Sequence, residues 1–523
     1  MAIASIVRRG EMAAPKKSAK KSPAVPKGSA PGDKGLKANA IGFASNVTIG
    51  VASTAPGYSL AASLGFVIGV AGIGFTSPAV MFVAFLPMLF IAAAYYWMNR
   101  ADPDCGTTFS WVTKAMGPYL GWMGGWGIAC AGTIVMANLA QIAGLYLFLL
   151  FGWESAAEST AAVTAVGVLF IVLMTAICVI GIELSARTQV GLLGAEIVTL
   201  ALFAIIALIK VYAGDGGPNA VEPSLSWFNP FEVGSFTALV DAVLIAVFIY
   251  WGWDSTVTVN EESEDSTHTP GKAAVVSTLI LLGIYLIVST AAQAFNGPAA
   301  LADQDDALSL LANDVFGSPL DKIVIIAVLT SAAASCQTTI LPNARTALAM
   351  ARQGAFPKAL GNVSTRYLTP HTATVIFGVL SVIWYVGLTI ISENILYDSI
   401  AALGLMIAFY YALTGFACIV YYRKQLLRDI KTFLIVGVAP LIGAVALTGL
   451  FIKSCFDLSD PANSTGGQAW LGVGPPLVIG LGFLLMGVVV MLCWRIGRPD
   501  FFTNSKLQIA SPSIFKQKAP KKA

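Results

Sequence analysis

The sequence predicts an all-helical protein that crosses a lipid bilayer many times, and three observations support this prediction. Of the 523 residues, 56% are hydrophobic and only 11% are charged, whereas a soluble domain carries roughly 25% charged residues. The apolar residues gather in stretches long enough to span a bilayer, which takes about 20 residues of helix. The basic residues are concentrated in alternate connecting segments. Together these features exclude a soluble enzyme, a nucleic-acid binder and a disordered scaffold.

Twelve apolar stretches follow one another along the chain. Each is longer and more uniformly apolar than the roughly 10-residue alternating strand of a membrane β-barrel, so each is predicted to be a transmembrane helix. Their windows are 42–72, 76–98, 117–151, 160–181, 188–213, 235–259, 273–295, 320–351, 371–392, 396–422, 431–453 and 473–495. The first 40 residues are polar and basic, and no cleavable signal peptide is expected there.

The basic residues predict the orientation, because loops that face the cytoplasm are enriched in Lys and Arg. With the N-terminus in the cytoplasm, all but three of the 31 Lys and Arg residues fall on the cytoplasmic side, the exceptions being Lys210, Lys322 and Lys453. We therefore expect a multi-pass protein of the cytoplasmic (cell inner) membrane with both termini in the cytoplasm. Segment 1–40 is predicted to be a disordered basic tail, and 496–523 a second basic tail.

Two of the twelve stretches contain residues that interrupt a helix. The break in the first stretch comprises Ser53, Thr54, Ala55, Pro56, Gly57 and Tyr58. The break in the sixth stretch comprises Tyr250, Trp251, Gly252, Trp253, Asp254 and Ser255. Pro removes a backbone donor and Gly readily leaves helical geometry. Unwound backbone at membrane depth is tolerated where it is buried in protein or lines a cavity.

The spacing of the breaks predicts the architecture. Five apolar stretches separate the start of the first broken stretch from the start of the second, which is the layout of two five-helix halves with inverted topology. The halves are 41–215 and 232–422, and 430–495 holds two peripheral helices. Such folds bind substrate near the midplane, where the broken helices meet. Freed amide groups suit a carboxylate and freed carbonyl groups suit a cation, so an amino acid would use both and a simple amine only the second.

Two acids lie deep inside apolar stretches, at a cost of about 2.5–3.5 kcal/mol each on insertion scales, whereas Asp241 and Asp398 lie near the outer ends of theirs and are expected at the interface. Asp254 is predicted to gate the pocket or to contact an ammonium group, the alternative being a hydrogen-bonded structural acid. Glu196 is predicted to carry a proton or to gate, the alternative being a carboxyl that only bridges helices. Both are therefore candidates for proton coupling.

Several uncharged side chains are further candidates for the pocket. They are Asn138, Gln141, Ser335, Gln337, Tyr410 and Tyr411. The alternative for each is a hydrogen bond that only bridges two membrane helices. Trp251 and Trp253 flank the acid and are predicted to gate the pocket or to contact a cation, the alternative being packing. No metal site or cofactor is expected, because the seven Cys include no Cys-x-x-Cys pair and the two His lie in loops.

Three groups of motif residues make the sequence recognisable. In and after the eighth stretch they are Asn343, Arg345, the run Met350-Ala351-Arg352-Gln353-Gly354, Pro357, Leu360, Thr369 and Pro370. After the second stretch they are Asp102, Pro103, Gly106, Phe109, Gly117, Gly121 and Trp126. Around the sixth stretch they are Gly252, Trp253, Asp254, Glu261, Glu262 and Pro270. In this order the chain resembles the amino acid–polyamine–organocation permease family over residues 40–495.

The resemblance implies a secondary active transporter that moves an amino acid or a related amine across the membrane by alternating access. Proton-coupled import is the first expectation, and an exchanger without net proton coupling is the alternative. Some related permeases carry a buried Lys, implicated in proton coupling, at the position of Glu196, so the sign of the charge is reversed here. The expected partners are a small-molecule substrate, protons and the lipid bilayer, in a monomer or homodimer. No nucleic acid, cofactor or enzymatic activity is expected.

Overall fold

The computed structural model describes residues 34–302, 304, 306–464 and 467–503, apart from the side chains of residues 393, 394 and 397. The predicted basic tails, 1–40 and 496–523, lie mostly outside the described residues, because residues 1–33 and 504–523 are not described. The described helices all belong to the unit that begins at Leu36.

Eleven helices among the described residues are long and apolar enough to cross a membrane. They are formed by α1 (Phe43–Ser53) with α2 (Pro56–Gly69), α3 (Ser77–Ala101), α5 (Pro118–Phe151), α7 (Thr160–Ile180), α8 (Ile182–Ala213), α11 (Thr269–Asn296), α14 (Lys322–Arg352), α15 (His371–Ile391), α16 (Glu393–Tyr422), α18 (Ala439–Asp457) and α19 (Pro475–Gly497). These helices match eleven of the twelve predicted windows. The all-helical, multi-span character predicted from the sequence is thus present.

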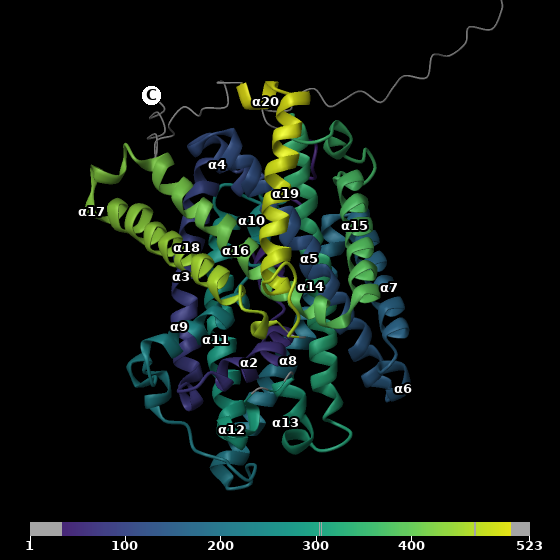
Figure 1. Cartoon of the computed structure of the whole chain (residues 1–523), viewed down its shortest axis with the longest axis vertical. Coiled ribbons are helices and arrows are strands. Elements are labelled where there is room, and N and C mark those ends of the chain that lie inside the picture. Colours follow the sequence, from purple (N-terminus) through teal and green to yellow (C-terminus); the bar gives the residue numbers. More distant parts are fainter. Residues whose placement is uncertain (1–33, 303, 305, 465–466, 504–523) are drawn as a thin grey trace, which may run out of the picture. The chain divides into compact units, whose positions relative to one another are not determined.

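The remaining helices are short. They are α4 (Thr108–Met116), α6 (Glu154–Ala157), α9 (Phe236–Phe248), α10 (Ser255–Thr258), α12 (Pro298–Leu301), α13 (Ala307–Phe316), α17 (Ile430–Thr432) and α20 (Asp500–Thr503). Single turns of 3-10 helix are η1 (Gly74–Thr76), η2 (Leu225–Phe228), η3 (Pro230–Glu232), η4 (Asn260–Glu262), η5 (Lys358–Gly361), η6 (Leu426–Arg428) and η8 (Pro461–Asn463), and η7 (Phe433–Val438) is a π-helix. In Figure 1, α4 and α20 lie at one end of the bundle, and α12 and α13 at the other.

The sixth predicted window, 235–259, does not form one long helix. It contains α9, which has 13 residues, then a turn, and then the four residues of α10. A continuous span needs about 20 residues, so α9 alone is too short. Both pieces lie where the sequence predicts an interrupted helix.

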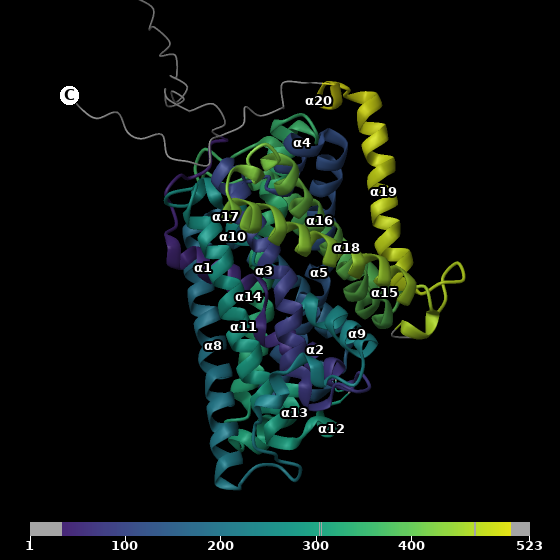
Figure 2. The same cartoon turned by 90° about the vertical axis from the view of Figure 1, so that its left-hand side faces the viewer.

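The two interrupted helices lie inside the bundle. The most apolar window of α1 and α2 is 89% buried, whereas that of α19 is only 22% buried. Helix α1 packs against α8, α11 and α14, and α14 packs extensively against α5 and α8. Figure 2 shows α1 and α10 in the upper half of the view and α2 and α9 in the lower half, with α19 along one edge. Both breaks are therefore enclosed by other helices at mid-height.

Candidate functional site

The first break occupies two residues between α1 and α2. Helix α1 ends at Ser53, and Ala55 adopts the left-handed conformation with φ 48° and ψ 61°. A non-glycine residue in this region costs about 1–3 kcal/mol. Helix α2 then restarts at Pro56, which suits a first helical position because no amide donor is needed there. The predicted interruption is present at the predicted residues.

The amide groups at the start of α2 all have partners within the protein. The Gly57 amide donates to Glu196 Oε1 over 2.6 Å, and the Tyr58 amide donates to Ser331 Oγ over 3.1 Å. The Ser59 amide donates to the Ala55 carbonyl over 2.7 Å. The donors that the sequence suggested for a substrate carboxylate are therefore occupied, one of them by a carboxylate of the chain itself.

The second break touches the first at a glycine. Gly252 has φ 118°, and a Cβ added there would lie 2.6 Å from the Ser53 carbonyl oxygen. The hydroxyl oxygens of Ser53 and Ser255 are 2.7 Å apart and share a hydrogen bond. The end of α1 and the loop before α10 thus meet in direct contact, as the inferred architecture requires of a site between two broken helices.

We expect Gly252→Ala to lower the free energy of unfolding by at least about 1–3 kcal/mol, because the new Cβ meets the Ser53 carbonyl oxygen and φ is positive. The change is measured as a lower melting temperature of the purified protein in detergent. Gly283→Ala is the matched control, because Gly283 lies within α11 and nothing approaches the position of its Cβ within 4 Å. Alanine there should be neutral or slightly stabilising. Equal melting temperatures for Gly252→Ala and the wild type would contradict the close approach.

A small pocket opens where the two breaks meet. Its cavity volume is about 10 Å³, roughly the space that one water molecule needs and far below the roughly 300–1,000 Å³ of typical ligand sites, so a substrate would need the breaks to move apart. Its lining residues are Ser53, Ile128, Gly132, Trp251, Gly252, Asp254, Ser255, Thr339, Pro342, Asn343 and Tyr410. One of them is acidic and none is basic, so the pocket favours a positively charged group.

The acid of the pocket is held by two tyrosines. The Tyr411 hydroxyl donates to Asp254 Oδ1 over 2.8 Å, and the Tyr410 hydroxyl donates to Oδ2 over 3.3 Å. The Tyr410 hydroxyl in turn accepts a hydrogen bond from Trp251 Nε1 over 2.5 Å. Only 3% of Asp254 is exposed. An ionised carboxylate only accepts hydrogen bonds, so this arrangement presents Asp254 as an acceptor at the pocket wall.

Asn343 supplies a second acceptor in the lining. A Cβ on Gly132 of α5 would lie 2.4 Å from Asn343 Oδ1, so the glycine permits the close approach of this side chain. The Asn343 amide nitrogen donates to the Ala129 carbonyl over 3.5 Å. Its Oδ1 is buried and has no hydrogen-bond partner among the described residues. A buried polar atom without a partner costs about 1–3 kcal/mol, which a ligand donor would recover.

Glu196 lies apart from the pocket lining, on α8. Its side chain is fully buried. Its Oε1 accepts from the Gly57 amide, whereas Oε2 has no partner in the part of the chain that the structure describes. Glu196 therefore contacts the first turn of α2 and lies outside the pocket lining that includes Asp254.

The predicted site residues separate into two groups. Those that line the pocket are Ser53, Trp251, Gly252, Asp254 and Ser255, together with Tyr410. Those outside the lining are Thr54, Ala55, Pro56, Gly57, Tyr58, Tyr250, Trp253, Asn138, Gln141, Ser335, Gln337, Glu196 and Tyr411. The second group includes the whole first turn of α2, which contacts α8 and α14 instead.

Several side chains outside the lining form hydrogen bonds between helices. The Asn138 amide donates to Ser399 Oγ over 3.0 Å, and Gln141 Oε1 accepts from the Tyr385 hydroxyl over 2.5 Å. The Gln337 carbonyl oxygen Oε1 accepts from Gln189 over 2.8 Å. These contacts join α5 to α16, α5 to α15 and α14 to α8, which is the helix-bridging alternative considered from the sequence.

The remaining candidates pack around the breaks. The Ser335 hydroxyl donates to the Ser53 carbonyl over 2.9 Å, so it satisfies the end of α1. The Tyr250 hydroxyl donates to the Met81 carbonyl over 3.1 Å. Trp253 lies against Tyr95, with ring centroids 5.2 Å apart. These residues hold the broken segments in place without lining the pocket.

Sequence reasoning missed five lining residues, namely Ile128, Gly132, Thr339, Pro342 and Asn343. A signal for some of them was available. Ser335, Thr339 and Asn343 recur every four residues in α14, and Ile128 and Gly132 have the same spacing in α5. Residues four apart share one helix face, so a polar face on α14 was open to inference.

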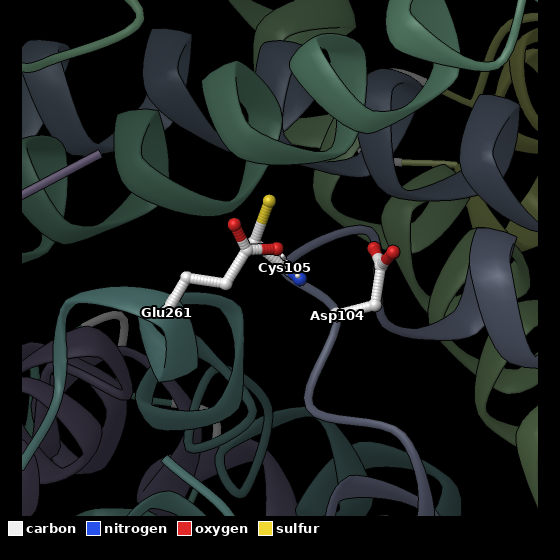
Figure 3. A group of neighbouring side chains, drawn as sticks. All are labelled: Asp104, Cys105 and Glu261. Atoms are coloured by element: carbon white, nitrogen blue, oxygen red, sulfur yellow. Dashed lines mark hydrogen bonds between the residues drawn. The ribbon is translucent and has the colours of Figure 1, made fainter. Parts of the chain in front are cut away.

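One cluster of side chains has the composition of a metal site. The candidate ligand atoms of Asp104, Cys105 and Glu261 lie within 4.8 Å of one another (Figure 3). Asp104 Oδ1 accepts from the Gly106 amide and the Ser110 hydroxyl, and Glu261 Oε1 accepts from the Cys105 amide over 3.0 Å. Cys105 Sγ donates to the Arg345 carbonyl over 3.6 Å. These contacts tie the loop before α4 to η4, which is a structural role.

A buried ion pair lies close to this loop. Nε and Nη2 of Arg345 each lie 2.5 Å from Glu262 Oε2. The side chains of Arg345 and Glu262 are 2% and 0% exposed. The Glu262 carbonyl also accepts from the Ala40 and Ile41 amides over 2.7 and 3.2 Å. The pair therefore joins α14, η4 and the segment before α1 at one end of the bundle.

The geometry agrees with what comparison of the chain with known proteins finds. A family model described as amino acid permease matches residues 39–493. A transporter of Mycobacterium tuberculosis, itself named uncharacterized, is 27% identical over 346 residues, which cover 66% of this chain and 71% of the relative. The branched-chain amino acid permease BcaP of Bacillus subtilis is 24% identical over 387 residues, covering 71% and 78%.

A further relative has a different named substrate. The low-affinity putrescine importer PlaP of Escherichia coli is 21% identical over 393 residues, covering 75% of this chain and 82% of the relative. The relatives are thus named as permeases or transporters, and the family match covers most of the chain. The resemblance predicted from the motifs is confirmed, and the chain belongs to the amino acid permease family, within the amino acid–polyamine–organocation transporters.

Proposed function

We propose that the protein imports an amino acid or a related amine by secondary active transport, with protons as the coupling ion. The observation that carries this proposal is the pocket between the two helix breaks, in which Asp254 is the one acidic side chain. An ammonium group is the feature that amino acids and amines share, and it would bind at this carboxylate. Among the relatives, BcaP is named for branched-chain amino acids and PlaP for putrescine.

The proposed architecture follows from the paired breaks. Residues 41–215 and 232–422 would form two five-helix halves of inverted topology, with 430–495 as two peripheral helices. In this arrangement α9 and α10 together make the sixth of twelve spans. Alternating access would then come from rocking one set of helices against the other around the pocket.

The proposed orientation rests on the distribution of basic residues. Arg100, Lys114, Lys272 and Arg352 lie near ends of α3, α4, α11 and α14, and Lys358 begins η5 after α14. We expect this end of the bundle to face the cytoplasm, in the inner membrane, with both termini on the same side.

Glu196 is the proposed proton carrier. It is fully buried and one of its oxygens has no partner among the described residues, and its other oxygen binds the amide of Gly57 in the first break. Gain or loss of a proton would change the strength of that contact. Proton transfer at this position would thereby be linked to the geometry of the break.

We expect addition of substrate to acidify the lumen of proteoliposomes that contain the wild-type protein, as read by a pH-sensitive dye inside them. Glu196→Gln should abolish this substrate-dependent signal, because an amide cannot carry the proton. Glu183→Gln is the control, since Glu183 lies on the same helix, is 47% exposed and pairs with Lys37 at the surface. Acidification that survives Glu196→Gln would reject the assigned role.

Exchange is the alternative transport mode, and the same vesicles separate it from symport. An exchanger would release preloaded radiolabelled substrate only when substrate is present outside. A proton symporter would instead import radiolabelled substrate into vesicles that contain no substrate inside. Failure of the wild-type protein to move any amino acid or amine in either assay would contradict the proposed function.

A further inference from the structure

The backbone amides at the start of α2 are already hydrogen-bonded within the protein, and this affects whether an amino acid or a simple amine can bind at the pocket. In an inferred site of this type, a helix start beside the pocket would hold a substrate carboxylate through its amide N–H groups. Here Pro56 has no amide proton, and the amides of Gly57, Tyr58 and Ser59 are all hydrogen-bonded within the protein. No free donor remains in this turn for a second carboxylate.

The pocket lining offers no charged donor to replace these amides, and its side-chain donors are the uncharged groups of Ser53, Ser255, Thr339, Tyr410, Asn343 and Trp251. It contains one acid and no Lys, Arg or His. The hydroxyl groups of Ser53 and Ser255 are hydrogen-bonded to each other, and the Tyr410 hydroxyl donates to Asp254. A substrate carboxylate in this pocket would be repelled by Asp254, and no basic side chain in the lining would offset the repulsion. The free-energy cost of removing the substrate carboxylate from water would also remain largely uncompensated.

An ammonium group meets the opposite conditions. Asp254 can accept its hydrogen bonds with full charge complementarity, and Asn343 Oδ1 is a buried acceptor without a described partner. Asp254 and Asn343 both line the same small cavity. The described lining thus offers a negatively charged acceptor to a cation, but it offers no positively charged donor to a carboxylate.

We infer that the pocket selects an organic ammonium compound without a carboxylate group, and that Glu196 sets this specificity by occupying the Gly57 amide with the chain's own carboxylate. The inference rests on the proposed transport function and narrows it. Glu196 is a specificity-determining residue in this proposal, because its Oε1 lies 2.6 Å from the Gly57 nitrogen. It thereby occupies a donor of the first turn of α2, which follows the lining residue Ser53 by four residues although Gly57 is not itself part of the lining.

Matched ligand pairs test the inference on the purified full-length protein in detergent. Putrescine and ornithine differ only in the carboxylate, as do isobutylamine and valine. Ligands that bind the folded state raise its melting temperature in proportion to occupancy. We expect the amine of at least one pair to bind about tenfold or more tightly than its amino acid, the size of one charge-assisted interaction.

Substitutions at Glu196 separate specificity from general loss of binding. Glu196→Ala frees the Gly57 amide, so the preference for the amine over the amino acid should shrink about tenfold or reverse. Glu196→Gln keeps an acceptor for the Gly57 amide and should retain most of the preference for the amine. This variant still tests the role of Glu196 if Glu196→Ala fails to fold. Thr199→Ala, at a buried position three residues further along α8, should leave the preference unchanged.

The outcomes distinguish the two proposals. Tighter binding of ornithine and valine than of their amines by the wild type would overturn the inference and leave the proposed transport function standing. A preference unchanged in Glu196→Ala would overturn the assigned role of Glu196. Absence of binding by all four compounds, with no transport of any amine or amino acid, would overturn both.

Discussion

We expect Asp254→Asn to abolish most substrate uptake while the protein still folds and inserts. Asparagine keeps the size of the side chain and can still accept a hydrogen bond from Tyr411, which donates to Asp254 over 2.8 Å. It removes the only negative charge of the pocket lining. Loss of one partner from a buried charge pair costs about 2–5 kcal/mol, so affinity for an ammonium substrate should fall about 100-fold.

The measurement is initial-rate uptake in proteoliposomes, with binding followed by thermal shift in detergent. Asp241→Asn is the matched control, because Asp241 lies on α9, outside the pocket, where it pairs with Lys453 over 2.9 Å and is 40% exposed. Breaking an exposed pair costs only about 0–1 kcal/mol, so this variant should transport like the wild type. Wild-type uptake by Asp254→Asn would remove Asp254 from the site.

The helical framework was largely predictable because it depends on long apolar runs. A run of about 20 apolar residues has few stable forms other than a spanning helix, since the bilayer leaves backbone groups no other partners. The breaks were predictable for a similar local reason, because Pro56, Gly57 and Gly252 disfavour a continuous helix. The short helices α4 and α13, which are about half or more buried, depend on tertiary contacts and were not predicted.

The pocket was only partly predictable. Ser53, Trp251 and Asp254 were found because they lie in the breaks themselves. Gly132 and Asn343 lie on uninterrupted helices, and which face such a helix turns toward a pocket is decided by packing. Nothing local to the sequence indicates that α8 and α14 would supply the partners of the α2 amides. The sequence therefore predicted a carboxylate site that Glu196 already fills.

The buried pair of Arg345 and Glu262 should have a large effect on stability. Each side chain is almost completely buried, and Nε and Nη2 of the guanidinium both contact Glu262 Oε2. Glu262→Gln or Arg345→Met would leave the other charge uncompensated, which costs about 3–5 kcal/mol for a buried pair. We expect a marked fall in the melting temperature of the purified protein for either single variant.

The double variant Glu262→Met/Arg345→Met distinguishes an ion pair from general packing. Replacing both charges by apolar side chains leaves no buried charge, and such replacements are often neutral or stabilising. The double variant should thus be more stable than either single variant, with a coupling energy of about 0.5–3 kcal/mol. Lys453→Met breaks the partly exposed pair with Asp241 and should change the melting temperature little. Strictly additive losses at Glu262 and Arg345 would mean that the two side chains contribute independently, and the link that they form between η4 and α14 would then not depend on their opposite charges.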